Sequence, residues 1–157
     1  MVFRPKASAK ETVHLSRFDV NEPLSSYSKH GFELDGQAWA SVEHYYQASK
    51  FPSGAHRDKI IAAEHPKQAT KLGEAWFKKK LSDWKRKQKI MMTRAVYTKC
   101  RSHPEIAEAL INTSNRQLVD VSQFDYFWGI GRDGRGENAY GEVLMAVRSK
   151  LIQEQAT

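Results

Sequence analysis

The segment Ser41-Val-Glu-His-Tyr-Tyr-Gln-Ala-Ser-Lys-Phe51 is the most informative stretch of the chain and has the pattern of a short amphipathic helix. Ser41 is a favourable N-cap residue, and Glu43 stands in the first turn, where a carboxylate is stabilising. Pro52 disfavours helical backbone at Phe51, so the helix should end there. One side of this helix would carry Val42, Tyr45, Tyr46 and Ser49.

Three polar residues would share another side of the same helix. Glu43, Gln47 and Lys50 fall at positions i, i+4 and i+7. Seven residues separate Glu43 from Lys50 by about 10 Å along the helix axis, which is too far for a direct salt bridge. That span suits two groups at opposite ends of a small polar ligand, whereas periodicity alone favours an ordinary solvated stripe. Both interpretations stay open at this point.

The flanking sequence predicts further short elements around this helix. Asp35-Gly36 lies between two alternating triplets, 32–34 and 37–39, and indicates a β-hairpin. Other strands are expected at 13–15 and 118–121, and other helices at about 56–64, 66–77, 82–101, 104–110 and from about 138 onwards. The sum is an α+β fold: a mostly helical single domain over 13–157 with a small antiparallel β element, preceded by a flexible N-terminal tail over 1–12.

Apolar stripes on the two longest predicted helices identify the candidate core. The last helix carries its stripe at Tyr140, Val143, Leu144, Val147 and Leu151. The helix over 82–101 carries one at Trp84, Met91, Met92, Ala95, Val96 and Cys100. Cys100 is therefore expected to be a buried structural thiol, and His44 a core or hydrogen-bonding histidine.

Length and composition exclude several classes of protein. A chain of 157 residues can bury a core of its own, and its four Trp, six Tyr and seven Phe argue against disorder. The single cysteine excludes a disulfide framework, and no apolar run approaches the roughly 18 residues that a spanning helix needs. The first twelve residues, MVFRPKASAKET, lack the apolar centre of a secretory signal. We expect a cytoplasmic protein, or a nuclear one in a eukaryote, with no membrane partner.

Positive charge is concentrated in one segment. The chain has 25 Lys and Arg against 18 Asp and Glu, a net charge of +7. The segment Lys78–Lys89, KKKLSDWKRKQK, contains seven basic residues and one acidic residue. Clustered bases around Trp84 are typical of a surface that binds a phosphate-rich partner such as nucleic acid. A solvated helix surface with a tryptophan anchored in the core explains the same pattern.

Most standard catalytic motifs are absent from the sequence. The six histidines are scattered, and neither HExxH nor CxxC occurs, so we expect no metal and no cofactor. Gly129-Ile-Gly-Arg-Asp-Gly134 matches G-x-G-x-x-G, but no buried strand precedes it and no helix begins within it, so a Rossmann site is excluded. The loop could still bind an anion through its backbone with help from Arg132 and Arg135, or it could be a long surface turn.

Four blocks of sequence, in this order and spacing, carry a resemblance to a known family. They are PLSSYSKHGFELDGQAWASVEHYYQASKF (23–51), the stretch from Trp84 to Lys99, Leu118-Val119 followed by Asp125-Tyr-Phe-Trp-Gly129, and GRGENAYGEVLMAVRSKL (134–151). Over roughly Leu24 to Leu151 the chain resembles the NADAR (NAD- and ADP-ribose-associated) or YbiA-like family. Ser26 stands where the family pattern L-S-N-F has asparagine, so family ligand contacts from this loop are not carried over.

The resemblance implies N-glycosidase chemistry. Members of the family cleave the bond between C1 of a ribose and an amine on a base. In the family, the lysine of the EHxxQxxK helix forms a Schiff base with the opened sugar, and the glutamate assists proton transfer. These two catalytic roles map onto Lys50 and Glu43.

Substrate-binding roles are also implied by the resemblance. Trp128 would line the pocket and stack on the base, or else belong to the core, and Asp125 would bind ribose or base, or cap the loop. Asn138 would touch ligand or cap the final helix. Gly129 and Gly131 would let the backbone approach a phosphate, and Arg132 would add a positive charge there. The other expected substrate contacts are Tyr46 and Gln47 of the first helix and Trp84 of the basic segment.

Three functional hypotheses follow. The first is removal of ADP-ribose from ADP-ribosylated guanine, as nucleotide or within modified DNA or RNA held by Lys78–Lys89. The second is hydrolysis of ribosylated aminopyrimidine phosphates of riboflavin synthesis to ribose 5-phosphate, a small-molecule ribosyl-phosphate substrate. The third, from another class, is a binding module for NAD or ADP-ribose without turnover. The intact pair of Glu43 and Lys50 favours an enzyme, because a binding module needs no nucleophile.

Overall fold

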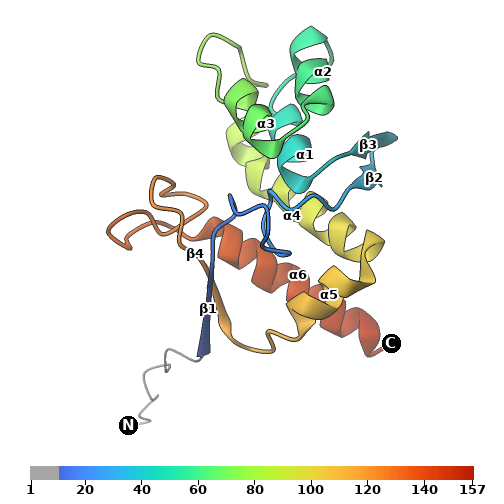
Figure 1. Ribbon diagram of the computed structural model, residues 1–157, viewed down its shortest axis with the longest axis vertical. Coiled ribbons are helices and arrows are strands. Elements are labelled where there is room, and N and C mark those ends of the chain that lie inside the picture. The colour runs from blue at the N-terminus through green and yellow to red at the C-terminus, as the bar shows by residue number, and fades with distance from the viewer. Residues whose placement is uncertain (1–10) are drawn as a thin grey trace.

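The computed structural model describes residues 11–157. Of the segment 1–12 that was expected to be a tail, residues 1–10 therefore lie outside the described part of the chain. Figure 1 shows the elements in space. The strands are β1 (Thr12–Leu15), β2 (Phe32–Leu34), β3 (Gln37–Trp39) and β4 (Gln117–Asp120). The helices are α1 (Val42–Ala48), α2 (Ala55–Ala62), α3 (Pro66–Gly73), α4 (Trp84–Ser102), α5 (Pro104–Ile111) and α6 (Ala139–Gln155). The prediction of an α+β, mostly helical fold is confirmed.

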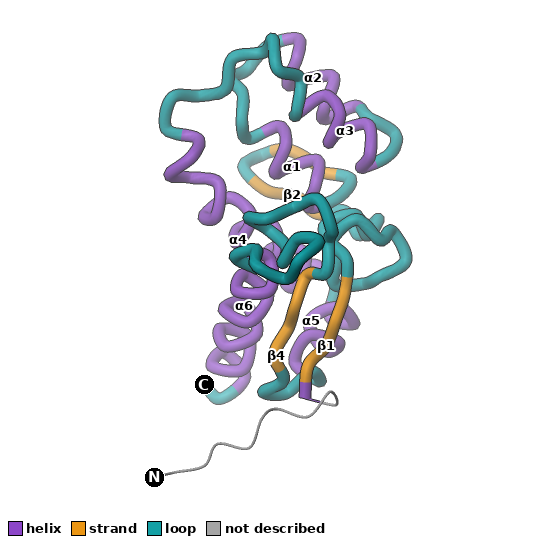
Figure 2. Tube along the Cα trace, turned by 90° about the vertical axis from the view of Figure 1, so that its left-hand side faces the viewer, coloured by secondary structure: helices purple, strands orange, loops and turns teal. Residues whose placement is uncertain are grey.

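The helices form two groups joined by α4. The short helices α1, α2 and α3 pack against one another at one end of the molecule, and α5 and α6 pack together at the other. The long helix α4 contacts α1 in the first group and both α5 and α6 in the second (Figures 1 and 2). One cluster of buried apolar side chains continues through both groups and includes Ile60 of α2 in the first group and Leu151 of α6 in the second.

The strands form two separate two-stranded sheets. β2 and β3 are antiparallel, with Asp35 and Gly36 at positive φ in the tight turn, as the sequence predicts. β1 and β4 are paired in parallel, with Thr12 opposite Gln117, which the sequence analysis did not predict. β1 also begins at Thr12, inside the segment expected to be a tail.

The parallel pairing places two loops at one end of the sheet, next to α1. β1 and β4 run side by side, and the chain leaves both of them at the end nearer to α1 (Figure 2). The loop after β1 carries Arg17 and Ser26, and the loop after β4 carries Asp125 and Trp128. Ligand sites in parallel sheets typically lie beyond the carboxyl ends of the strands.

Core predictions for the long helices hold almost throughout. All five predicted positions of α6 are buried, as are Trp84, Met92, Ala95, Val96 and Cys100 of α4, whereas Met91 is half-buried. Burial raises the pKa of the Cys100 thiol to about 11, as suits a structural thiol. Within residues 11–157, no helix is both long and apolar enough to span a membrane.

Two features of the helices differ from the predictions. α3 ends at Gly73, four residues before the expected end, and Trp76 and Phe77 after it are exposed. Lys99 lies within the apolar face of α4 and is buried, because its Nζ donates hydrogen bonds to the carbonyls of Pro23 and Ser25 at 2.5 and 3.0 Å. This contact joins α4 to the loop that carries Ser26.

Candidate active site

Helix α1 is buried on every side, which overturns the interpretation of its polar residues as a solvated stripe. Glu43 and Gln47 have exposed fractions of 0% and 1%, and Lys50, just past the helix end, has 5%. Ser41 caps the helix as predicted, since its Oγ accepts a hydrogen bond from the backbone N–H of His44. The His44 ring bonds to Ser41 Oγ and to the carbonyl of Ala63, so it is a structural histidine, as expected.

Glu43 is enclosed by four polar groups from distant parts of the chain. Arg17 Nη1 donates to Oε2 at 2.6 Å, and the Ser26 hydroxyl lies 2.9 Å from the same oxygen. Gln47 Nε2 donates to Oε1 at 2.8 Å, and the Thr70 hydroxyl donates to it at 2.9 Å. Both carboxylate oxygens are therefore saturated by protein donors.

The surroundings of Glu43 keep it ionised. Burial alone would raise the pKa of its carboxyl, but Arg17 and the hydrogen bonds from Gln47, Ser26 and Thr70 outweigh burial and hold the pKa below its usual value. An ionised carboxylate without exposed surface has neither a proton to give nor contact with a ligand. The structure therefore favours a positioning and electrostatic role for Glu43 over the direct proton transfer expected from the resemblance.

Lys50 is a buried amine without an anionic partner among the residues that the structure describes. Its Nζ lies 5.2 Å from the centre of the Tyr46 ring and makes no hydrogen bond or ion pair within residues 11–157. Burial, followed by the nearby charge of Lys80, lowers its pKa to about 8, although Glu43 opposes that shift. About a tenth of Lys50 is therefore a neutral, nucleophilic amine at pH 7, far more than at the ordinary lysine pKa.

Lys50 opens onto a pocket of about 410 Å³ between α1, the loop that follows α3 and the start of α4. Within the described part of the chain, three lysines and no carboxylate line it. Its lining residues are Tyr46, Lys50, Lys80, Leu81, Ser82, Trp84, Lys85 and Gln88. A larger cavity of about 600 Å³ lies between α4, α5 and α6, away from this site.

Three aromatic side chains form one wall of the site and its support. Tyr46 packs against Trp84 and Trp128, with ring centres 5.3 Å apart in each case. Trp128 Nε1 donates to the Tyr46 hydroxyl at 3.0 Å and is buried, so it stands behind Tyr46 instead of lining the pocket. Of the three, Tyr46 and Trp84 are in place to touch a ligand.

Asp125 supports the site from the loop after β4. Its Oδ1 accepts hydrogen bonds from the backbone N–H groups of Phe127 and Trp128, and its Oδ2 lies 3.4 Å from Arg17. It thus caps its own loop, one of the two predicted roles, and helps to fix Arg17. It does not line the pocket.

The glycine-rich loop is shaped by its own packing. A Cβ on Gly129 would lie 3.0–3.1 Å from three carbonyl oxygens, two of the same loop and one of Asp120 at the end of β4. One on Gly131 would lie 2.3 Å from the Tyr126 ring. Arg132 is exposed and, like both glycines, lies outside the lining of the Lys50 pocket. Phosphate binding by this loop stays a prediction without structural support.

Asn138 departs from its expected role as a helix cap. It occupies the N-cap position of α6, but its side chain makes no capping hydrogen bond. Instead its amide accepts from the N–H of Asp120 and donates to the carbonyl of Leu118, which ties α6 to strand β4. With both ends of the amide occupied by the backbone, Asn138 is a structural residue here.

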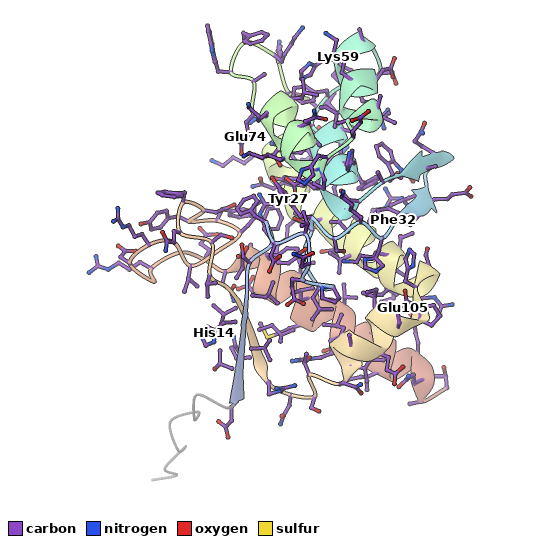
Figure 3. The ribbon with its side chains drawn as sticks, viewed as in Figure 1. His14, Tyr27, Phe32, Lys59, Glu74 and Glu105 are labelled. Atoms are coloured by element: carbon purple, nitrogen blue, oxygen red, sulfur yellow. The ribbon has the colours of Figure 1, made fainter. Side chains whose placement is uncertain are left out.

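Sequence analysis missed the residues that complete the site. Arg17 and Thr70 come from segments without a recognisable motif. Tyr27, whose hydroxyl lies 2.7 Å from that of Thr70, lies in the family block 23–51 but was not singled out as a site residue (Figure 3, where Tyr27 is labelled). Ser26 was noted only as a departure from the family pattern, yet it contacts Glu43 directly. Lys80 and Lys85 were visible only as part of the basic segment.

Fold and pocket together describe an α+β domain built around helix α1, which is followed directly by a buried lysine that has no ion-pair partner in the described part of the chain. Comparison with known proteins gives this domain its class: the NADAR domain model matches residues 3–152, and the chain belongs to that family. An N-glycosidase of Nostoc punctiforme is 38% identical over 131 residues, covering 82% of this chain and 84% of that protein. A riboflavin biosynthesis protein of Vibrio vulnificus is 35% identical over 133 residues, covering 85% of this chain and 36% of that protein.

A solved structure shares the fold. The NMR structure of the Escherichia coli protein YbiA superposes with a TM-score of 0.84 at 29% identity, covering 92% of this chain and 87% of that one. The relative from E. coli itself is called N-glycosidase YbiA.

Proposed function

We propose that this protein is an N-glycosidase that cleaves the bond between ribose C1 and an exocyclic base amine, with Lys50 as the nucleophile. The observation that carries the proposal is the state of Lys50: buried, free of any anionic partner within residues 11–157, and with a pKa lowered to about 8 at the wall of a pocket. Relatives named N-glycosidase support the same reaction class.

The reaction begins with opening of the ribose ring, which converts the N-glycoside into an imine at C1. The neutral amine of Lys50 adds to C1, and its two protons pass in turn to the nitrogen of the base, the second as the bond between C1 and that nitrogen breaks. The base leaves as its free amine, and an imine between C1 and Lys50 stays behind. Water then adds to C1, releases the sugar as an aldehyde and restores the amine of Lys50.

Glu43 supports this chemistry without lining the pocket. Its negative charge, with the Arg17 guanidinium beside it, fixes the polar side of α1 and sets the field around Lys50. Gln47, held by Glu43, completes the buried network one turn before Lys50.

Two substrates fit this chemistry. ADP-ribosylated guanine is the first candidate, and its large ADP group would extend well beyond a pocket of about 410 Å³. Ribosylated aminopyrimidine phosphates are the second candidate, and two observations favour them. The pocket lies at the small end of the range for ligand sites, and one relative is named as a riboflavin biosynthesis protein.

The test is reductive trapping followed by peptide mapping. Wild type is mixed with each substrate and borohydride, and we expect a sugar-derived mass increment on the Lys50 peptide. Lys50→Ala should lose both the increment and turnover while keeping the far-UV circular dichroism spectrum of a folded protein, whereas Lys59→Ala, at an exposed position of α2, should behave as wild type. Retained turnover in Lys50→Ala would exclude the covalent mechanism. Tight ligand binding without any product in wild type would favour a binding module.

If the substrate is ADP-ribosylated guanine within DNA or RNA, the protein must also bind the nucleic-acid strand. Trp76 is 92% exposed and packs edge-on against exposed Phe77, directly before Lys78. Exposed aromatic rings beside lysines suit stacking on unpaired bases together with phosphate contacts. If this surface holds a strand, affinity for modified DNA or RNA should fall steeply with salt, and a flat salt response would favour the small-molecule substrate.

A further inference from the structure

The charge balance of the Lys50 pocket is one-sided. Lys50 is only 5% exposed, its amine has no hydrogen-bond acceptor within residues 11–157, and the nearby charge of Lys80 repels its ammonium form. Lys80 and Lys85 line the same space, and no carboxylate does so in the described part of the chain. Glu43 and Glu74 are near enough to act on Lys50, but neither lines the pocket. Asp83, between the lysines in sequence, is paired with Lys87 at 2.7 Å and does not line it either. The lining of the Lys50 pocket is therefore positively charged, and a bound anion would neutralise it.

The cationic residues are held in place by the backbone. The N–H of Leu81 donates a hydrogen bond to the carbonyl of Lys50 at 2.7 Å, which fixes the loop against the residue that bears the amine. The next turn leads into the N-terminus of α4, where the N–H of Trp84 bonds back to the carbonyl of Leu81. Lys80 and Ser82 therefore flank a fixed point, one on either side of Leu81.

The start of α4 adds to the attraction for an anion. Asp83 occupies the N-cap position, but its side chain makes no capping hydrogen bond. Lys85 and Gln88 lie in the first two turns of this 19-residue helix and face the pocket. The positive end of the helix dipole thus points towards the same space as the lysines.

We propose that Lys80, Ser82 and Lys85 form a subsite for the terminal phosphate of a ribosyl phosphate whose C1 lies at Lys50. This inference rests on the proposed function and deepens it, because it assigns the phosphate to the basic segment and not to the glycine-rich loop. C1 and the 5-phosphate stand at opposite ends of the sugar. A phosphate bound at the start of α4 therefore leaves C1 free to reach the amine deeper in the pocket.

The experiment compares two sugars that differ only in the group on O5. Ribose 5-phosphate or 5-O-methylribose is incubated with the protein and cyanoborohydride, and modification of Lys50 is quantified by peptide mass spectrometry over a concentration series. Neither sugar can close to a six-membered ring, because O5 is substituted in both, so a preference for ribose 5-phosphate reports recognition of the phosphate. In wild type we expect half-modification at about tenfold lower concentration of ribose 5-phosphate, as two charge contacts would give.

Two double variants test where the phosphate binds. Lys80→Ala/Lys85→Ala should abolish the preference for the phosphorylated sugar. Lys67→Ala/Lys71→Ala removes the same charge from two exposed lysines of α3 that do not line the pocket, and it should keep the preference. Thermal melting of both variants checks that the fold is intact.

The outcomes separate the subsite from the chemistry. Equal modification of Lys50 by both sugars in wild type, or a preference that survives in Lys80→Ala/Lys85→Ala, would overturn the subsite and leave the Schiff base standing. If neither sugar modifies Lys50, the covalent mechanism fails. The subsite is then judged by calorimetric binding of ribose 5-phosphate, and equal affinity of wild type and Lys80→Ala/Lys85→Ala would overturn it as well.

Discussion

Arg17 Nη1 lies 2.6 Å from Oε2 of Glu43, and both side chains are buried. This ion pair connects the loop after β1 with the first turn of α1, two segments that share no secondary structure. Asp125 approaches Arg17 from the loop after β4, so one guanidinium joins three parts of the chain. The pair therefore holds the N-terminal end of α1, the end opposite to Lys50, against both loops of the parallel sheet.

Removing Arg17 should be among the most destabilising changes in the protein. Arg17→Met leaves Glu43 buried without its counter-charge, and we expect the free energy of unfolding to fall by about 3–5 kcal/mol. Urea denaturation followed by far-UV circular dichroism measures the change. The control is Lys89→Ala, which breaks the exposed pair with Glu142 and should cost less than about 1 kcal/mol. Similar losses in both variants would contradict the anchoring role of Arg17.

Two buried serines on the same loop offer a matched comparison. Ser26 Oγ contacts Glu43, whereas Ser28 Oγ is buried without a hydrogen-bond partner within residues 11–157. Ser26→Ala should lower the free energy of unfolding by about 1–3 kcal/mol, because a buried carboxylate loses a donor. Ser28→Ala should be neutral or slightly stabilising. The prediction fails if the two variants denature at the same urea concentration.

The buried amine of Lys50 should cost stability at neutral pH. Its pKa is lowered from 10.5 to about 8 in the folded protein, so the unfolded chain binds more protons between these values. Stability from this group therefore rises as the pH increases from 8 to 10.5. Lys50→Met should be more stable than wild type by about 3 kcal/mol below pH 8, with the difference vanishing towards pH 10.5. A pH-independent difference in urea denaturation would show that Lys50 does not titrate as described.

The same pKa governs the rate. Attack needs the neutral amine, so single-turnover cleavage should rise with pH and level off above about pH 8. Lys80→Ala removes a neighbouring positive charge, which should raise the pKa of Lys50 and move the profile to higher pH. A stopped-flow pH series on wild type and Lys80→Ala measures this. A profile that keeps its midpoint in the variant would mean that Lys80 does not tune the amine.

Local sequence patterns predicted most of the fold. The hairpin at Asp35-Gly36, the Ser41 cap and the apolar face of α6 each depend on neighbours within a few residues, and each is confirmed. The parallel pairing of β1 with β4 joins segments more than a hundred residues apart, and no local pattern specifies it. The burial of Lys99 depends in the same way on distant carbonyls, those of Pro23 and Ser25.

The candidate site was only partly predictable for the same reason. Lys50 was identified from its motif, but periodicity favoured a solvated stripe for Glu43 and Gln47. Burial of Glu43 is possible because Arg17, Ser26 and Thr70 arrive from other elements to satisfy its carboxylate, and Gln47 in turn donates to Glu43. A buried polar network of this kind is invisible in the sequence until its partners are placed in space.

The contact between Leu81 and Lys50 uses main-chain atoms alone: the N–H of one residue and the carbonyl of the other. Any residue except proline can supply that N–H. Neighbouring positions such as Lys80 and Ser82 can therefore be exchanged by mutation while the reactive residue keeps its anchorage. The side chains proposed to select the substrate can therefore change in evolution independently of the residue proposed to cleave it. Descendants of this domain could acquire new substrates while the position of Lys50 is kept.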